Sequence, residues 1–276
     1  MTTNYFYKNT KSKFLEISGQ DSVPFIQNLI TNDINKCKEN HFVYSCLLTP
    51  QGKFFADFFI FKNKKKYFFE VNDIFYENFL NKLNMYKLRS NINIEEIKLF
   101  YSFIIFGELE INNHYEILNF DPRNNNIGKK LIQYDPLIKF NEKIIEIDEK
   151  KYHEILIKNK VPYSPFDLQE NKSLLLENNF DNINAISWNK GCFVGQEITA
   201  RMKYRALLKK QLYALELISG KINIGDKIIE KGVVLGEVIS KANQYIFCIL
   251  KIELVREKSE KKALLDIDSS TTLKFL

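Results

Sequence analysis

One segment of the chain, WNKGCFVGQE at 188–197, combines the residue types that are best suited to chemistry. Gly191 and Gly195 bracket Cys192, so the backbone can turn sharply there and approach a ligand closely. Lys190 lies close before the cysteine, and a neighbouring positive charge and a helix N-terminus both favour a thiolate. The segment alone predicts a reactive thiol or a ligand-binding loop, and a buried cysteine in a tight loop is an equally good interpretation.

A helix should begin near Gly195 and run to about Arg205. Gln196 and Glu197 then fall in its first turn, where a carboxylate interacts favourably with the helix dipole. Glu197, Arg201 and Arg205 are spaced by four residues and share one face of this helix. These charges fit either a ligand-binding face or ion pairs on an exposed helix.

The other cysteines and the histidines do not form a metal-binding pattern. Cys37, Cys46 and Cys248 are far apart, no cysteine pair has C-x-x-C spacing, and the three histidines are scattered. We therefore expect no zinc site and no local cluster-binding motif. The thiols suit a reducing compartment.

The net charge of +6 raises the possibility of an anionic partner such as tRNA. Lysine is abundant but arginine, the better phosphate ligand, is scarce, so a nucleic-acid surface is the weaker interpretation. The first 17 residues lack the apolar region of a signal peptide, and no apolar run approaches the roughly 18 residues of a membrane span. We expect a cytoplasmic protein with no membrane partner.

Hydrophobic patterning predicts an α+β region in the first part of the chain. Strands are expected at 13–17, 42–48, 54–61, 67–71, 92–97 and 99–106. The turn Thr49-Pro50-Gln51-Gly52 should join the second and third of these in a hairpin. Helices are expected after Asp21, at 73–87 and at about 150–159, with apolar residues four apart on the first two.

The pattern of predicted secondary structure changes after Leu207. Short strands at 212–218, 227–229, 233–240 and 245–252 alternate with glycine turns, which predicts a small antiparallel barrel or sandwich. The segment 161–182 should be mostly loop, and the charged runs at 62–66 and 257–262 should be solvated loops. The expected domains are 1–205, with two subdomains, and a β-barrel at 206–276.

The central motif resembles the signature of a known family. Lys190-Gly191-Cys192-Phe193-Val194-Gly195-Gln196-Glu197 followed by Arg201 is similar to K-G-C-[FY]-x-G-Q-E-x-x-x-R of the YgfZ family of folate-binding proteins, which are CAF17-like factors for iron–sulfur clusters. The resemblance extends to ISGQD at 17–21, LTPQGK at 48–53, Asp121-Pro122-Arg123 and Gly128. Such proteins resemble the glycine cleavage T-protein, a tetrahydrofolate-dependent aminomethyltransferase.

The resemblance implies a T-protein-like fold of antiparallel sheets with covering helices around a folate pocket. It implies a role for Cys192 as a functional thiol and a role for Asp57 beside the reacting folate. Folate contacts are expected from these residues: Tyr152, Lys190, Gly191, Gly195, Gln196, Glu197, Arg201 and Arg205. A core position is an equal alternative for Tyr152, and Asp121 with Arg123 is expected to form a loop-fixing ion pair.

The chain also departs from the related families. The T-protein has two acidic residues where this chain has Ala56 and Asp57, which argues against aminomethyl transfer. Leu156 and Lys160 stand where the family has Arg and Gly, and Ala206 replaces a further Gly. The expected function is therefore a folate-binding factor for the assembly or repair of iron–sulfur enzymes, indirectly supporting tRNA modification. The alternatives are a one-carbon transferase and a tRNA-binding module.

Overall fold

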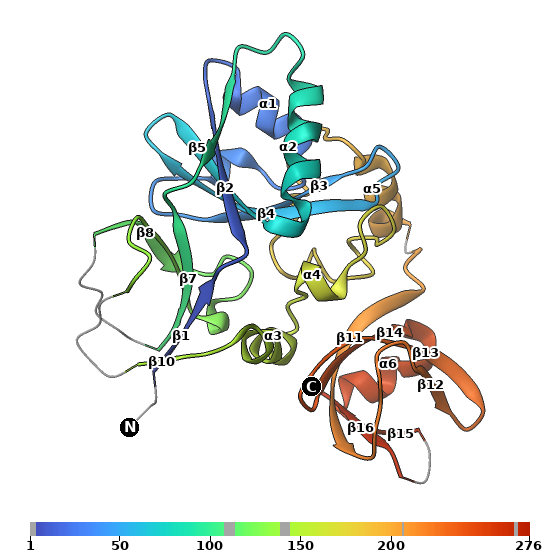
Figure 1. Cartoon of the computed structure of the whole chain (residues 1–276). Helices are drawn as coiled ribbons and strands as arrows, with labels where there is room; N and C mark the ends of the chain where they lie inside the picture. Colours follow the sequence, from blue (N-terminus) through green and yellow to red (C-terminus); the bar gives the residue numbers. More distant parts are fainter. Residues whose placement is uncertain (1–3, 108–113, 139–143, 206, 268–269) are drawn as a thin grey trace.

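The computed structural model describes residues 4–107, 114–138, 144–205, 207–267 and 270–276. It contains three sheets, with helices on and between them (Figure 1). The α+β fold with a C-terminal barrel predicted from the sequence is confirmed. No helix among the described residues is both long and apolar enough to cross a membrane.

The first sheet is antiparallel, with strand order β3-β4-β5-β2-β6. Its strands are β2 (Ser12–Ser18), β3 (Val43–Leu48), β4 (Phe54–Asn63), β5 (Lys66–Asn72) and β6 (Asn93–Ile97). Helices α1 (Ser22–Leu29) and α2 (Asp73–Lys87) contribute to its core, α1 through Phe25 and Leu29 and α2 through Phe79. The spacing of four in the sequence thus places these side chains on one buried helix face, as predicted.

The second sheet has the order β10-β1-β7-β9-β8. Its strands are β1 (Tyr5–Asn9), β7 (Tyr101–Phe106), β8 (Tyr115–Phe120), β9 (Lys129–Gln133) and β10 (Ile145–Glu146), and only the β1–β10 pair is parallel. A cluster that is mostly phenylalanine joins this sheet to the first, with Phe14 and Phe61 from the first sheet and Ile132 from the second. The packing of large aromatic side chains explains the high aromatic content of the chain.

The third sheet has the order β12-β13-β14-β11-β16-β15 and curls into a nearly closed barrel (Figure 1). Its elements are β11 (Lys210–Ser219), β12 (Lys227–Glu230), β13 (Val233–Ala242), β14 (Tyr245–Lys251), α6 (Ile252–Glu260), β15 (Leu264–Asp266) and β16 (Thr272–Phe275). The barrel has its own core, which includes Leu215, Cys248 and Val255.

The connection between the sheets and the barrel contains three helices: α3 (Glu149–Lys158), α4 (Ser164–Asp167) and α5 (Gln196–Tyr204). Ile157 of α3 is buried against Leu212 and Phe247 of the barrel. Two short 3-10 turns, Ile34–Lys36 and Asn125–Ile127, complete the elements. Lys160, where the related family has Gly, adopts a φ of 58° just after α3, a conformation that glycine reaches at lower cost.

Two predictions from the sequence are wrong. The charged run at 62–66 was expected to be a solvated loop, but 62–63 ends β4 and Lys66 begins β5, so that only residues 64 and 65 form the turn. The charged run at 257–262 was expected to be a solvated loop, but 257–260 completes α6. Val255 of this helix is fully buried in the barrel core, and that contact stabilises a helix whose other positions are mostly charged. Six strands were also missed, because each is short or carries polar residues: β1, β8, β9, β10, β15 and β16.

Candidate functional site

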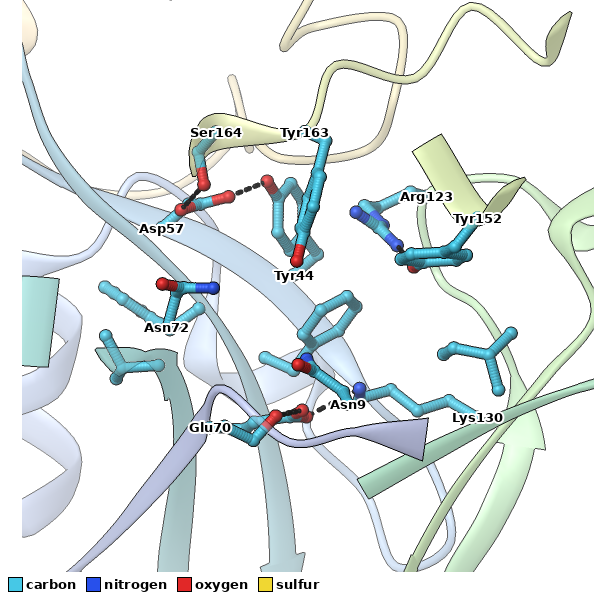
Figure 2. A pocket seen from close by; sticks show the side chains of 15 residues that line it. Asn9, Tyr44, Asp57, Glu70, Asn72, Arg123, Lys130, Tyr152, Tyr163 and Ser164 are labelled. Atoms are coloured by element: carbon cyan, nitrogen blue, oxygen red, sulfur yellow. Dashed lines mark hydrogen bonds and ion pairs between the residues drawn. The ribbon is translucent and has the colours of Figure 1, made fainter. Parts of the chain in front are cut away.

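A buried polar cavity lies where the first two sheets meet α3 and α4 (Figure 2). Its walls come from seven strands, two helices and the loops beside them: Asn9, Ser12, Tyr44, Asp57, Phe58, Phe59, Glu70, Val71, Asn72, Ile104, Arg123, Lys130, Tyr152, Tyr163 and Ser164. The cavity volume is about 40 Å³. That volume is of the order of one water molecule's share of the liquid, and far below the roughly 300 Å³ of a small-ligand pocket.

Asp57 lies at one end of this cavity, on β4. Its carboxylate accepts hydrogen bonds from the hydroxyl of Tyr44 and from that of Ser164, the latter at 2.6 Å (Figure 2). Burial raises the pKa of Asp57, while the two hydroxyls and the nearby Arg123 act in the opposite direction. The result is one carboxylate, held in a fixed position, that can accept hydrogen bonds or a proton inside the cavity.

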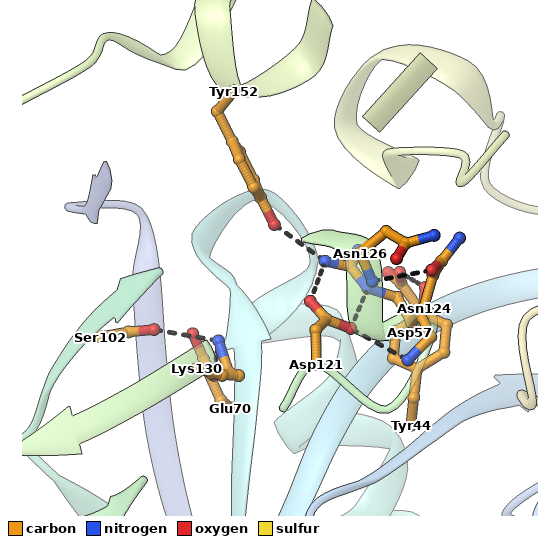
Figure 3. A network of polar contacts seen from close by, with 10 residues as sticks. Tyr44, Asp57, Glu70, Ser102, Asp121, Asn124, Asn126, Lys130 and Tyr152 are labelled. Atoms are coloured by element: carbon orange, nitrogen blue, oxygen red, sulfur yellow. Dashed lines mark hydrogen bonds and ion pairs between the residues drawn. The ribbon is translucent and has the colours of Figure 1, made fainter. Parts of the chain in front are cut away.

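Arg123 and Tyr152 form a second polar group at the cavity wall. Arg123 makes a buried ion pair with Asp121 at 2.8 Å, as predicted, and also donates to the Tyr152 hydroxyl at 2.8 Å (Figure 3). The Tyr152 ring stacks on Tyr7 at a centroid distance of 4.4 Å, and burial raises the pKa of Tyr152 to about 12. Tyr152 is therefore both a core aromatic and part of the cavity wall.

A buried lysine completes the polar lining. Lys130 Nζ lies 2.6 Å from Glu70 Oε2 and donates to Ser102 at 3.0 Å (Figure 3). It also lies over the Phe59 ring, 4.2 Å from the ring centroid. Burial lowers the pKa of Lys130, and the charge of Glu70 opposes that shift. The second oxygen of Glu70 accepts from Ser12 at 2.5 Å. Each charge in this pair is thus compensated within the protein.

Lys190 of the K-G-C motif anchors the Cys192 loop to the end of α1 and does not present an exposed charge. Its Nζ donates to the carbonyl oxygens of Gln27 at 2.5 Å, Ile30 at 2.6 Å and Asn32 at 2.9 Å, around the C-terminal end of α1. Burial lowers its pKa to about 8, and the carboxylate of Asp33 opposes the shift. Lys190 thereby satisfies carbonyls that a helix end leaves without partners.

The two glycines of the motif have different surroundings. Gly195 has a φ of 78°, and a Cβ atom there would lie 2.4 Å from the Thr49 carbonyl oxygen in the β3–β4 turn. Gly191 is different, because a Cβ atom built there meets nothing within 4 Å. Cys192, between the two, is exposed. The loop is thus fixed by Lys190 and Gly195, while Gly191 and Cys192 face outward.

The charged face predicted for α5 forms, but on the surface. Glu197 and Arg201 make an ion pair at 2.5 Å, with side chains 75% and 56% exposed, and Arg205 is the C-terminal cap residue of the helix. Such an exposed pair contributes little to stability. The high exposure leaves both side chains accessible to a partner.

The structure therefore divides the predicted site residues into two groups. Asp57 and Tyr152 line the cavity. The others lie on the Cys192 loop and on α5, and none of them is part of the cavity wall: Lys190, Gly191, Cys192, Gly195, Gln196, Glu197, Arg201 and Arg205. The turn after β3 connects the groups, because it touches Gly195 and leads into the strand that carries Asp57.

Several cavity residues were missed by the sequence reasoning: Asn9, Ser12, Tyr44, Glu70, Asn72, Lys130, Tyr163 and Ser164. One usable signal was present for Glu70, which interrupts the apolar strand sequence YFFEV at 67–71. A charge inside an apolar strand needs a buried partner, and here the partner is Lys130.

Comparisons with known proteins agree with this architecture. Residues 9–104 match the GCVT N-terminal domain. The chain is 25% identical to an iron–sulfur cluster assembly factor IBA57 homologue of Mycosarcoma maydis, over 73% of this chain and 54% of that protein. It is 29% identical to the tRNA-modifying protein YgfZ of Buchnera aphidicola from Schizaphis graminum, over 77% and 72% of the two chains. The chain thus spans little more than half the length of the IBA57 relative.

The fold has a solved counterpart. The crystal structure of the glycine cleavage system aminomethyltransferase T from Bartonella henselae superposes with a TM-score of 0.77 at 10% identity, covering 99% of this chain and 85% of that one. At this identity the likeness establishes the fold, and function is a separate question. The chain therefore has the GcvT fold, and it is similar in sequence to YgfZ and IBA57 proteins.

Proposed function

We propose that this protein is a folate-binding accessory factor for the assembly or repair of iron–sulfur enzymes, which indirectly supports tRNA modification. The observation that carries the proposal is the exposed thiol of Cys192, on a loop that Lys190 and Gly195 anchor to a GcvT fold. The names of the relatives point the same way, since they describe iron–sulfur cluster assembly and tRNA modification.

The two groups of residues then have separate tasks. The cavity at Asp57 would bind the folate heterocycle, and the Cys192 loop would meet the protein or cluster that is being served. The folate contacts expected from Lys190 and α5 remain a proposal, and Arg201 and Arg205 would suit the anionic tail of a folate. Lys190 would contribute indirectly, by holding the loop in position, because its ammonium group already donates to three carbonyl oxygens.

The chemistry of the cavity fits a reduced folate. A pterin edge carries several donors and acceptors, and Asp57 offers carboxylate oxygens to the donors. Asn72 Nδ2 is buried and has no hydrogen-bond partner among the described residues, so it offers a donor that a ligand oxygen or nitrogen could satisfy. Because the cavity volume is only about 40 Å³, binding would require the lining side chains to separate.

A one-carbon transferase is the alternative function. When bound, the folate would carry the one-carbon unit, and Asp57 would accept or hold a proton beside it. The neighbouring position is occupied by Ala56, whose side chain is fully buried, so the pair of carboxylates found in the T-protein is absent from this strand. We therefore favour folate binding without aminomethyl transfer.

The test is a titration of the purified protein with tetrahydrofolate, followed by calorimetry and by Trp188 fluorescence. We expect an affinity in the micromolar range, on the order of 8 kcal/mol. The Asp57→Ala variant should lose binding, whereas Asp266→Asn, at an exposed position of the barrel, should retain it. Absence of heat and of thermal protection at saturating folate would reject the folate assignment, and glycine-dependent aminomethyl transfer would favour the transferase.

We also keep three further parts of the interpretation as proposals. The chain divides near residue 205 into the folate-binding region and the barrel, a division supported by the separate core of the barrel. The protein acts in the cytoplasm, although the IBA57 relatives are described as mitochondrial. Direct binding of tRNA is the weaker alternative, and its test is a gel-shift assay in which binding must weaken steeply with salt.

A further inference from the structure

A second large depression lies away from the Asp57 cavity, between the end of α5, the start of β11 and α6. Its volume is about 950 Å³. Its walls are Leu174, Glu177, Met202, Leu207, Leu208, Lys209, Lys210, Lys251, Ile252, Glu253 and Arg256. We call this the α5–α6 groove.

The groove combines an apolar floor with a basic rim. Five of its residues are aliphatic or methionine, and Leu207 is 52% exposed. Lys209, Lys251 and Arg256 are exposed, and no ion pair of theirs is found among the described residues. Lys210 pairs with Glu177, but only at 3.6 Å. An exposed apolar surface rimmed by charge is characteristic of a protein-interaction site.

We propose that the α5–α6 groove binds an amphipathic helix of a partner protein, with carboxylates on either side of its apolar face. The excess of cations over carboxylates on the rim selects an acidic partner through charge complementarity. Apolar side chains of the helix would enter the groove, and Met202 would adapt to their shapes. The groove would be the surface that binds the protein served under the proposed function. The role of that partner therefore rests on the proposed function.

Two structural facts favour a helix of a protein over other occupants. Lys210 of β11 and Lys251 of β14 are paired with each other, so the groove offers no free strand edge to an extended peptide. None of the residues that line the groove is aromatic, so a single-stranded nucleic acid would find no surface for base stacking. A helix needs neither feature, because its backbone hydrogen bonds are internal.

The location of the groove connects it to the Cys192 loop. Helix α5 begins directly after the loop and ends at the groove, and its nine residues span roughly 13 Å. Trp188, in the segment before Cys192, contacts the Tyr204 ring at the groove end of α5 with centroids 6.0 Å apart. A partner held in the groove would therefore lie within one short helix of the exposed thiol.

The test uses a synthetic helical peptide with leucine at i, i+3, i+4 and i+7 and glutamate on the flanking positions. The full-length protein is labelled with ¹³C at the methionine methyl groups, of which the chain has three. We expect the Met202 signal to shift on titration while that of Met85, on α2, stays unchanged. A control peptide with lysine in place of glutamate should not bind.

The paired variant Lys251→Glu with Arg256→Glu should weaken binding of the acidic peptide at least tenfold, while tetrahydrofolate binding stays unchanged. That contrast separates failure of this inference from failure of the proposed function. The inference is overturned if the acidic peptide does not bind, or if it binds the paired variant equally well. It is also overturned in favour of RNA if oligouridylate displaces the peptide and shifts Met202.

Discussion

Gly195 lies backbone to backbone against Gly52: a Cβ atom on Gly195 would be 3.1 Å from Gly52 Cα and 2.4 Å from the Thr49 carbonyl oxygen. This contact joins the Cys192 loop to the turn between β3 and β4. Asp57 follows five residues after Gly52, which corresponds to roughly 17 Å along a strand. One hairpin therefore fixes the position of the Cys192 loop relative to Asp57.

Gly195→Ala should destabilise the protein by about 2 kcal/mol, because a side chain there combines a positive φ with a clash against backbone. Gly191→Ala is the matched control, since its Cβ atom would meet open space. Urea unfolding of both variants measures the difference. Equal losses of stability would show that the contact with the turn does not hold the loop.

Asp57→Asn should raise the melting temperature at pH 7. Burial raises the pKa of Asp57, so the folded state binds this proton more tightly than the unfolded state, and the charged carboxylate costs stability above the unfolded pKa. The advantage of the variant should shrink as the pH falls through the folded pKa and vanish near pH 4. Calorimetry across this range, with the exposed Asp266→Asn as control, checks the sign.

Lys130→Met should cost about 3–5 kcal/mol, because it leaves Glu70 buried without its cation. The double variant with Glu70→Gln should recover much of that loss. A double-mutant cycle from urea unfolding gives the coupling directly. If the two single losses simply add, the charges are not compensating each other and the ion pair is misassigned.

Cys192 should react with iodoacetamide far faster than the other three thiols. Burial raises the pKa of Cys37 to about 12, and it also raises the pKa of Cys46 and of Cys248. Peptide mass spectrometry at increasing reaction times measures the four rates.

The matched variants separate function from packing. Cys192→Ser should leave the melting temperature unchanged but abolish support of iron–sulfur enzymes in cells. Cys248→Ser should lower stability while function persists, since this thiol lies in the barrel core. Full activity of Cys192→Ser would make the motif structural and leave the folate cavity alone as the functional site.

The sequence predicts much of the fold, because local patterns suffice for its longer elements. The helix at 73–87 matches α2 at both ends, since its apolar residues and its cap at Asn72 act within the segment itself. The hairpin around Thr49-Pro50-Gln51-Gly52 also follows from turn chemistry. Helix α6 could not be predicted in the same way, because burial of Val255 in the barrel is a tertiary contact.

The candidate site is less accessible to sequence reasoning. The motif around Cys192 is continuous, so it could be found, but the cavity is assembled from strands, helices and loops between Asn9 and Ser164. Sequence spacing does not show that Glu70 and Lys130 meet, nor that Ser164 reaches Asp57. Lys190 anchors its loop by donating to carbonyl oxygens more than 150 residues earlier in the chain, and no local sequence pattern predicts these contacts.

The exposed loop also gives the natural chain its own spectroscopic labels. Cys192 is the exposed one of its four thiols, so a maleimide dye should attach at a single position without any engineering. Trp188 is the sole tryptophan of the sequence and lies four residues away, where it can act as an energy-transfer donor to that dye. The unmodified protein therefore contains a donor and an acceptor site that report on the same loop in real time.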